Sequence, residues 1–404
     1  MRRAVELFIP GGLVLLAALV FLRPGVLPAS AAPLLSVYPY AVAGIGVFLG
    51  WYFNRSRVVF GLLILVIADR VLEGSPAALG AGGGAGRTVF NVVALLLPIN
   101  LAAYSLLSER GVLTRRAAGR LIPLLGQVLA VGLLWWFRRS ELDALLNYRF
   151  LAVDLAAWTP ITQPALLAFG AAFVLLACRF FLIRNPIERS FVWAVAAAFT
   201  ALQTGGSGWN ATAFFATAEL ILGISVIEMS YRMAYYDELT GLPGRRALNE
   251  TLLKLGSQYA VGMVDVDHFK QFNDRYGHDV GDQVLRMVAA KLERVSGGGK
   301  SFRYGGEEFA VVFPAQTAED ALSHLESLRR EVQASCFVLR GPDRPKKKPD
   351  TPKPPSGPRK AVLVTVSIGV AAWDEQKRRP DHVIKAADLA LYRAKTAGRN
   401  TVKL

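Results

Sequence analysis

The sequence predicts an α-helical transmembrane bundle followed by a separate α/β domain, and three observations support this division. The chain of 404 residues is 53% hydrophobic and only 19% charged, whereas globular chains carry about 25% charged residues. Residues 1–236 contain no lysine and hold 18 arginines and 10 acidic residues, while residues 237–404 hold 28 basic and 21 acidic residues. Long apolar segments are confined to the first half, and the second half alternates between strand and helix patterns.

Eight segments of the first half are apolar and approach the roughly 20 residues that a helix needs to cross a bilayer. They are residues 5–22, 34–53, 58–72, 88–107, 119–137, 161–183, 190–204 and 211–230. Ten loop arginines fall on internal segments and five on external ones if the N-terminus is cytoplasmic, which is the favoured orientation. We therefore predict about eight spans, with the lipid bilayer as a partner. Asp69 and Glu219 are candidates for a polar cavity, because ionisable groups within spans are costly and often functional.

The second half predicts four helices and five strands. The helices are 245–255, 279–295, 318–332 and 381–396, and the strands are 259–267, 301–304, 308–313, 336–339 and 362–372. Residues 231–236 form a short linker, and the apolar stripe through Ile224, Ile227, Tyr231 and Tyr235 predicts that the last span continues into it as one helix.

Composition excludes several classes of protein. Two cysteines and four histidines at unrelated positions exclude a disulfide scaffold and a zinc ribbon. Residues 340–360 hold eight basic and two acidic residues among many prolines, which predicts a disordered insert. A contact with anionic lipid headgroups is the alternative interpretation of this insert. Without the insert the second half is nearly neutral, so we predict no nucleic-acid partner.

Acidic residues gather at two predicted strand ends. Asp265 and Asp267 end the first strand, where alternation puts both on the same face. Glu307 and Glu308 follow Gly305-Gly306 on a predicted hairpin. Carboxylates in this arrangement supply the oxygen ligands that Mg²⁺ prefers, together with waters and substrate phosphates. The alternative interpretation is an ordinary turn with solvated acids.

Two cations near the end of the last helix complete the pattern. Lys395 and Arg399 could neutralise the outer phosphates of a nucleotide. Glycine beside the acids would let that nucleotide lie against bare backbone.

Five sequence blocks give the second half a family resemblance. They are DELTGLPGRR (237–246), VDVDHFKQFNDRYGHDVGD (264–282), RYGGEEF (303–309), VSIGVA (366–371) and ADLALYRAKTAGRN (387–400). In this order they closely resemble the GGDEF family, the diguanylate cyclases. The resemblance covers nearly all of residues 237–404 and does not extend to residues 1–230.

The resemblance implies a fold and an activity. The domain should be palm-like, with a central, mostly antiparallel five-stranded sheet flanked by helices. Two such domains of a homodimer, paired through the GGDEF and transmembrane regions, should face each other and condense two GTP into cyclic di-GMP and two pyrophosphates. The transmembrane region should control this arrangement. The implied location is a bacterial inner membrane, with the catalytic domain in the cytoplasm where GTP is found.

The resemblance also implies roles for individual residues. Magnesium, with two ions per site and Mn²⁺ as a possible substitute, should be held by the Asp265 carboxylate, the Val266 carbonyl and Glu307. Glu307 is also the expected general base, and Lys270 should stabilise the transition state. The remaining positions should bind GTP: Asn273 and Asp282 at the guanine, His278 at the nucleotide, Lys395 and Arg399 at the phosphates, and Gly305 and Gly306 by close backbone approach.

One departure and two alternatives accompany this interpretation. The family's inhibitory Arg-x-x-Asp site is replaced by Ser296-Gly297-Gly298-Gly299, which predicts weak or no product inhibition there. A non-catalytic receptor for GTP or cyclic di-GMP, and a transporter with a regulatory tail, are the alternative functions.

Overall fold

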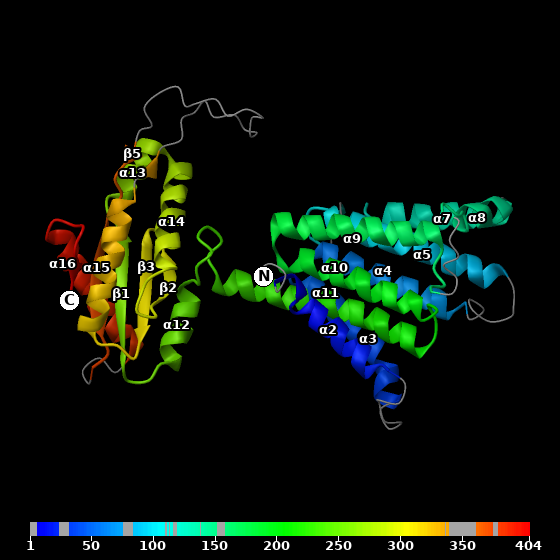
Figure 1. Ribbon diagram of the computed structural model, residues 1–404, viewed down its shortest axis with the longest axis horizontal. Helices are drawn as coiled ribbons and strands as arrows, with labels where there is room; N and C mark the ends of the chain where they lie inside the picture. Colours follow the sequence, from blue (N-terminus) through cyan, green and yellow to red (C-terminus); the bar gives the residue numbers. More distant parts are fainter. Residues whose placement is uncertain are drawn as a thin grey trace. The chain divides into compact units, whose positions relative to one another are not determined.

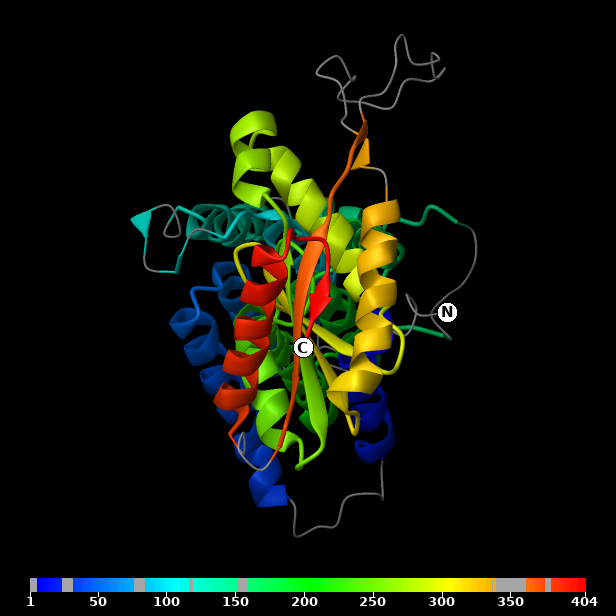
Figure 2. The same cartoon turned by 90° about the vertical axis from the view of Figure 1, so that its left-hand side faces the viewer.

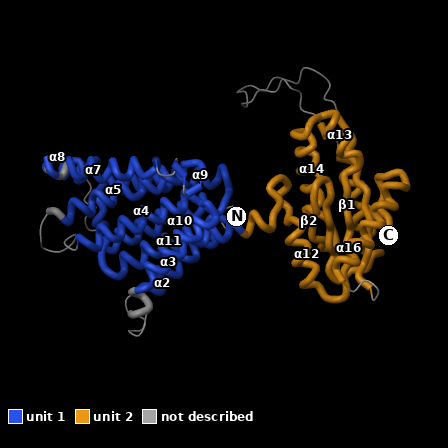
Figure 3. Tube along the Cα trace, turned by 180° about the vertical axis from the view of Figure 1, so that it is seen from behind, with its two compact units in different colours: residues 1–230 blue, residues 231–404 orange. Residues whose placement is uncertain are grey.

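A computed structural model of the chain shows two compact units, residues 1–230 and 231–404 (Figures 1 and 3). The structure describes residues 6–23, 32–75, 84–109, 111–112, 114–115, 119–137, 139–151, 158–335, 337–338, 361–374 and 379–404. The basic insert at 340–360 lies outside these described residues, so its predicted disorder stays a prediction.

The described part of the first unit is entirely helical. Its helices are α2 (Gly11–Phe21), α3 (Ala32–Tyr52), α4 (Ser56–Glu73), α5 (Gly84–Leu106), α7 (Leu121–Phe137), α8 (Arg139–Leu146), α9 (Gln163–Ile183), α10 (Pro186–Gln203) and α11 (Trp209–Tyr235). Each of the eight predicted apolar segments coincides with one of them, and the short α8 was not predicted. Helix α11 continues without interruption past residue 230.

Three described helices are long and apolar enough to cross a membrane, by length and composition: Gly86–Leu106, Gln163–Ile183 and Trp209–Tyr235. The prediction of about eight spans is therefore too high for the described residues. Helix α4 fails because Arg57, Asp69, Arg70 and Glu73 make it too polar. The other apolar stretches are shorter, at Gly11–Phe21, Val37–Tyr52 and Leu121–Leu133.

Ion pairs join several helices of the first unit. Glu188 on α10 is 1% exposed, and its carboxylate contacts Arg57 Nη1 of α4 at 2.6 Å and Arg179 Nε of α9 at 2.5 Å. Arg57 also contacts Glu109 at 2.9 Å. On the next residue of α10, Arg189 pairs with Glu228 of α11. Glu188 is thus neutralised by Arg57 and Arg179, whereas Glu219 of α11 is 3% exposed and its Oε2 atom has no hydrogen-bond partner.

The second unit contains a five-stranded sheet in the order β2-β3-β1-β6-β7. Its strands are β1 (Tyr259–Val266), β2 (Lys300–Gly305), β3 (Glu308–Pro314), β6 (Val366–Ala372) and β7 (Val402–Lys403). The pairs β2–β3, β3–β1 and β1–β6 are antiparallel, whereas β6 and β7 are parallel. The expectation of a mostly antiparallel sheet is therefore corrected to a mixed sheet, because β7 follows a helical crossover from β6.

Helices cover both faces of this sheet, as Figure 2 shows for α15 (Ala318–Ala334) and α16 (Pro380–Thr396). Alternate β1 residues explain the two cores. Ala260 and Val264 pack with α14 (His278–Leu292) and α15, while Val261 and Met263 pack with α12 (Arg245–Lys254) and α16. A Cβ at Gly369 of β6 would lie 2.0 Å from the Leu391 nitrogen, so glycine permits the close approach of α16.

Local structure departs from the prediction at three further places. Helix α13 (Phe269–Tyr276) was not predicted as a separate element. The predicted strand 362–372 is divided into β5 (Ala361–Val362) and β6. Strand β5 pairs with β4 (Phe337–Val338) in a separate two-stranded sheet.

Candidate functional site

Strand β1 places Asp265 at the sheet edge where the predicted site lies. Asp265 follows Val261 and Met263 on the face covered by α12 and α16, and it is 4% exposed. Glu308 is its register partner on β3. Lys395, near the end of α16, reaches the Asp265 carboxylate at 2.9 Å. The structure thus brings one predicted phosphate-binding cation onto one predicted metal ligand.

The hairpin between β2 and β3 brings Glu307 to the same edge. The Val266 amide donates to the Glu307 carbonyl at 3.3 Å, which ties the hairpin to the end of β1. Gly306 has a φ of +49°, a left-handed conformation that glycine adopts without strain. Arg303 donates to the Gly306 carbonyl at 2.7 Å and so fixes the turn.

Burial destabilises the ionised forms of the carboxyl groups at this edge, and the Asp265 charge adds to this effect for both glutamates. Burial raises the pKa of Asp265, and the ion pair with Lys395 offsets this only in part. Burial, followed by the nearby Asp265 charge, raises the pKa values of Glu307 and Glu308. Lys395 opposes the shift in both glutamates. The site therefore holds more negative charge than its cations neutralise.

This donor set suits a hard divalent cation. Carboxylate oxygens under mutual repulsion gain from a cation placed between them. Among the described residues, no group of three or more His, Cys, Asp or Glu side chains is arranged to hold a metal. Protein ligands here would thus be the Asp265 and Glu307 carboxylates with a backbone carbonyl such as that of Val266, and waters or substrate phosphates would supply the rest.

Asp267 has a different role from Asp265. Its carboxylate accepts hydrogen bonds from Ser367 Oγ at 2.6 Å, Thr365 Oγ1 at 2.7 Å and the Asn400 amide at 3.1 Å. Asp267 therefore ties β1 to β6 and to the residues before β7, and its oxygens are occupied within the protein.

The predicted guanine-binding residues lie on α13 and α14. The Oδ1 atom of Asn273 is buried and has no hydrogen-bond partner. A Cβ at Gly281 would lie 1.8 Å from this oxygen, so glycine is required for Asn273 to pack there. Asp282 directly follows Gly281 and is half-buried. The two predicted residues are thus close in the structure, with an acceptor free for a ligand.

The remaining predicted residues are exposed. Lys270 lies on α13, His278 begins α14, and Arg399 follows α16. The positive charge of Arg399 partly opposes the burial that raises the pKa of Asp265. For Lys270 and His278, the described contacts include none with the acidic residues of the site, so their roles stay predictions.

Sequence reasoning missed a pair that joins α11 to the hairpin. Asp237, two residues after α11, contacts Arg303 Nη1 at 2.7 Å and accepts from Thr240. Burial alone would raise the pKa of Asp237, but these hydrogen bonds outweigh it and lower the pKa. Arg303 also holds Gly306, so one side chain connects the end of the helix with the turn beside Glu307. The sequence feature that could have indicated this pair is Arg303, the basic residue directly before Tyr304-Gly305.

Comparisons with known proteins find similarity over the second unit of the chain. Residues 234–401 match the family described as diguanylate cyclase, GGDEF domain. The response regulator PleD from Caulobacter vibrioides is 35% identical over 184 residues, which cover 44% of this chain and 37% of PleD. The diguanylate cyclase VdcA from Vibrio cholerae is 36% identical over 173 residues, which cover 42% of this chain and 46% of VdcA.

A solved structure of the coiled coil and GGDEF domain of DgcB from Caulobacter crescentus, in complex with c-di-GMP, is 33% identical. The match covers 44% of this chain and 88% of that one, with a TM-score of 0.38. The chain covers less than half the length of PleD and of VdcA. The motifs and the family match together show that residues 234–401 of this chain belong to the GGDEF diguanylate cyclase domain family.

Proposed function

We propose that the protein is a membrane-bound diguanylate cyclase that condenses two GTP into cyclic di-GMP with release of two pyrophosphates. The observation that carries this proposal is the convergence of Asp265, Glu307 and Glu308 on one sheet edge beside Lys395, within a GGDEF domain. In each half-reaction a 3′-hydroxyl attacks the α-phosphorus of the other GTP, and the bond to the pyrophosphate oxygen breaks.

Charge at the site determines how the residues would share this chemistry. Asp265, the Val266 carbonyl and Glu307 are suited to hold Mg²⁺, which when bound neutralises phosphate charge and lowers the pKa of the attacking hydroxyl. Glu307 has a raised pKa because of burial and Asp265, which makes it a better proton acceptor than an ordinary carboxylate. Lys395 is close enough to exchange its contact with Asp265 for a phosphate oxygen.

The other predicted residues would bind and orient GTP. The unpartnered Asn273 Oδ1 can accept from a guanine N–H, and Asp282 can accept from a second. Arg399 would contact the outer phosphates, and Gly305 and Gly306 would let them approach the backbone. Lys270 and His278 are exposed and would complete their contacts only with the nucleotide in place.

The helical unit would anchor the protein in a bacterial inner membrane and control how two cyclase domains meet. The three apolar helices support a membrane location. Helix α11 runs from the bundle to Tyr235, and residues 231–236 serve as its short link to the cyclase, so bundle motions would reach the homodimer without a separate relay domain.

The test is to incubate the full-length protein in liposomes with GTP and Mg²⁺ and to identify the nucleotide formed by mass spectrometry. We expect cyclic di-GMP from the unmodified chain, and none above background from Glu307→Ala. Glu293→Ala, which removes an exposed acid of the same domain, is the matched control and should retain activity. GTP binding without product in the unmodified chain would instead support the non-catalytic receptor.

A further inference from the structure

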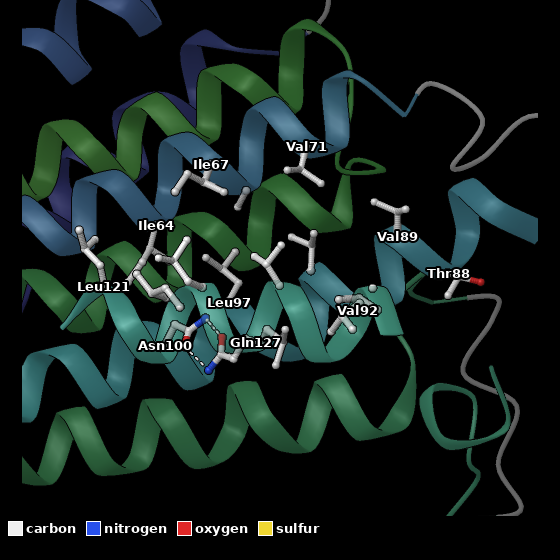
Figure 4. A pocket seen from close by; sticks show the side chains of 18 residues that line it. Ile64, Ile67, Val71, Thr88, Val89, Val92, Leu97, Asn100, Leu121 and Gln127 are labelled. Atoms are coloured by element: carbon white, nitrogen blue, oxygen red, sulfur yellow. Dashed lines mark hydrogen bonds between the residues drawn. The ribbon is translucent and has the colours of Figure 1, made fainter. Parts of the chain in front are cut away.

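The helical unit contains an apolar cavity that the proposed cyclase chemistry does not use. The cavity has a volume of about 520 Å³ and lies among α4, α5 and α7. Figure 4 shows side chains such as Ile64, Leu97 and Leu121 directed into it. Its size falls within the range of about 300–1,000 Å³ that is typical of small-molecule sites. Leu125 and Val128 of the lining are 66% and 69% exposed, so the cavity is open to the outside of the bundle. An occupant must therefore be mostly hydrocarbon.

Three polar residues interrupt the apolar lining: Thr88, whose hydroxyl donates to Asp143, and the pair formed by Asn100 and Gln127. The amide of Asn100 on α5 donates to Gln127 of α7 at 2.9 Å, and Gln127 donates back to Asn100 at 3.0 Å (Figure 4). Asn100 is only 8% exposed. An amide offers two donor hydrogens and an oxygen with two lone pairs, so this reciprocal pair leaves one donor and one acceptor position open on each residue. The cavity thus carries a hydrogen-bonding site on a mostly apolar wall.

The depth of this pair argues against a lipid chain as the occupant. The apolar span Gly86–Leu106 has 21 residues, or roughly 31 Å of helix, which matches a hydrocarbon core of about 30 Å. Asn100 precedes the end of this span, Leu106, by six residues, which places it about 9 Å inside the apolar region. Acyl chains offer no hydrogen-bonding groups at that depth.

The wall of α7 leaves room for a ligand at Gly132. Gly132 lines the cavity, and a Cβ at this position would meet nothing within 4 Å. Gly126 on the same helix also meets nothing within 4 Å but does not line the cavity. These two glycines provide a matched pair of positions, because the same larger side chain would fill the cavity at one and avoid it at the other.

We propose that this cavity binds an uncharged, mostly hydrocarbon small molecule that carries one hydroxyl or carbonyl group, held by the Asn100–Gln127 pair. The inference goes beyond the cyclase activity and rests only on the proposal that the bundle lies in a membrane. A diffusible molecule of this class satisfies both the apolar lining and the open amide positions, whereas a phospholipid chain satisfies only the lining.

The test uses decanol with a photoreactive diazirine on its chain, applied to the full-length protein in liposomes. We expect crosslinks on peptides from α5 and α7, reduced by excess decanol and much less by excess decane. Gly132→Leu should lower labelling at least about tenfold, equivalent to about 1.4 kcal/mol of binding free energy. Gly126→Leu should leave labelling unchanged.

Two results would overturn the proposal. The first is equal competition by decane and decanol, which would indicate that the probe only partitions into an apolar surface. This competition is measured on the unmodified chain, so its result stays decisive even if the Gly132→Leu variant does not reach the membrane. The second is full labelling of an inserted Gly132→Leu variant. Because labelling needs no GTP turnover, a negative labelling result is distinguishable from a negative cyclase assay. Liposome flotation detects any loss of membrane insertion.

Discussion

Glu188 of the helical bundle and the acidic residues of the GGDEF site differ in how far nearby cations neutralise them. In the bundle, Glu188 is 1% exposed and forms ion pairs with Arg57 of α4 and Arg179 of α9. In the GGDEF domain, burial raises the pKa values of Asp265, Glu307 and Glu308, and the Asp265 charge adds to the shift of both glutamates, with Lys395 as the nearby cation.

This difference separates structural charge from functional charge. A buried ion pair with both partners present neutralises its own charge and offers nothing to a ligand, while removal of one partner is strongly destabilising. An acidic cluster short of positive charge gains when a cation binds, and its folded-state cost is tolerated where binding requires it. The predictions below test this distinction by removing charge from each region.

The largest effect is expected for Asp265→Asn. The substitution removes a metal ligand but preserves size, so cyclic di-GMP formation should fall roughly 10²–10³-fold or more, as when a group that stabilises transition-state charge is lost. Initial rates in liposomes measure this, with thermal unfolding as the control for folding. Activity within about twofold of the unmodified chain would remove Asp265 from the site.

Arg57→Met tests the neutralised region. The change leaves Glu188 with only Arg179 and strands part of a buried charge, which should destabilise the bundle by about 3–5 kcal/mol. Arg115→Met is the control, because it removes an exposed arginine of the same unit. Thermal inactivation in detergent should separate the two variants, and equal behaviour would argue against a structural role for the Glu188 network.

Asp267→Ala should reduce stability more than it changes the chemistry. Three donors, from Ser367, Thr365 and Asn400, would lose their acceptor. Each buried unsatisfied donor costs about 1–3 kcal/mol, and partial access to water should bring the total to about 2–4 kcal/mol. Chemical unfolding of the second unit, residues 231–404, measures this loss of stability. An unchanged unfolding midpoint would show that the three hydrogen bonds do not stabilise the fold.

The smallest effect concerns Asp237 and its pH dependence. Because hydrogen bonds lower the folded-state pKa of Asp237 below its ordinary 3.8, ionised Asp237 stabilises the fold above that pH and loses this contribution as the pH falls below it. Asp237→Asn should therefore cost about 1 kcal/mol at neutral pH. The difference from the unmodified chain should disappear in acid, and a difference independent of pH would assign the loss to packing.

Sequence patterns predicted elements with strong periodicity and failed where tertiary contacts decide the structure. The helices α12, α14, α15 and α16 and strand β1 were predicted within a few residues. Strand β7 has two residues, too few to show a period, and α13 has eight, of which only Phe269 is buried. The apolar helices were located, but the short length of three of them and the charged residues of α4 reduced the number able to span a membrane.

The candidate site was predictable in its residues and not in their division of roles. Alternation puts Asp265 and Asp267 on one face, so sequence cannot distinguish the acid left for a ligand from the acid used by Ser367 and Thr365. The Asp237–Arg303 pair joins residues 66 positions apart, and only the fold reveals it. The Asn100–Gln127 pair was missed for the same reason.

The most direct test of the central idea measures metal binding itself. Mn²⁺ is the expected substitute for Mg²⁺ at the proposed site and is visible by electron paramagnetic resonance. The full-length protein in detergent can therefore be titrated with Mn²⁺ in the presence of GTP. The account predicts that Asp265→Asn and Glu307→Gln each weaken protein-bound Mn²⁺ and that the double variant adds little further loss. Unchanged Mn²⁺ affinity in both single variants would contradict it.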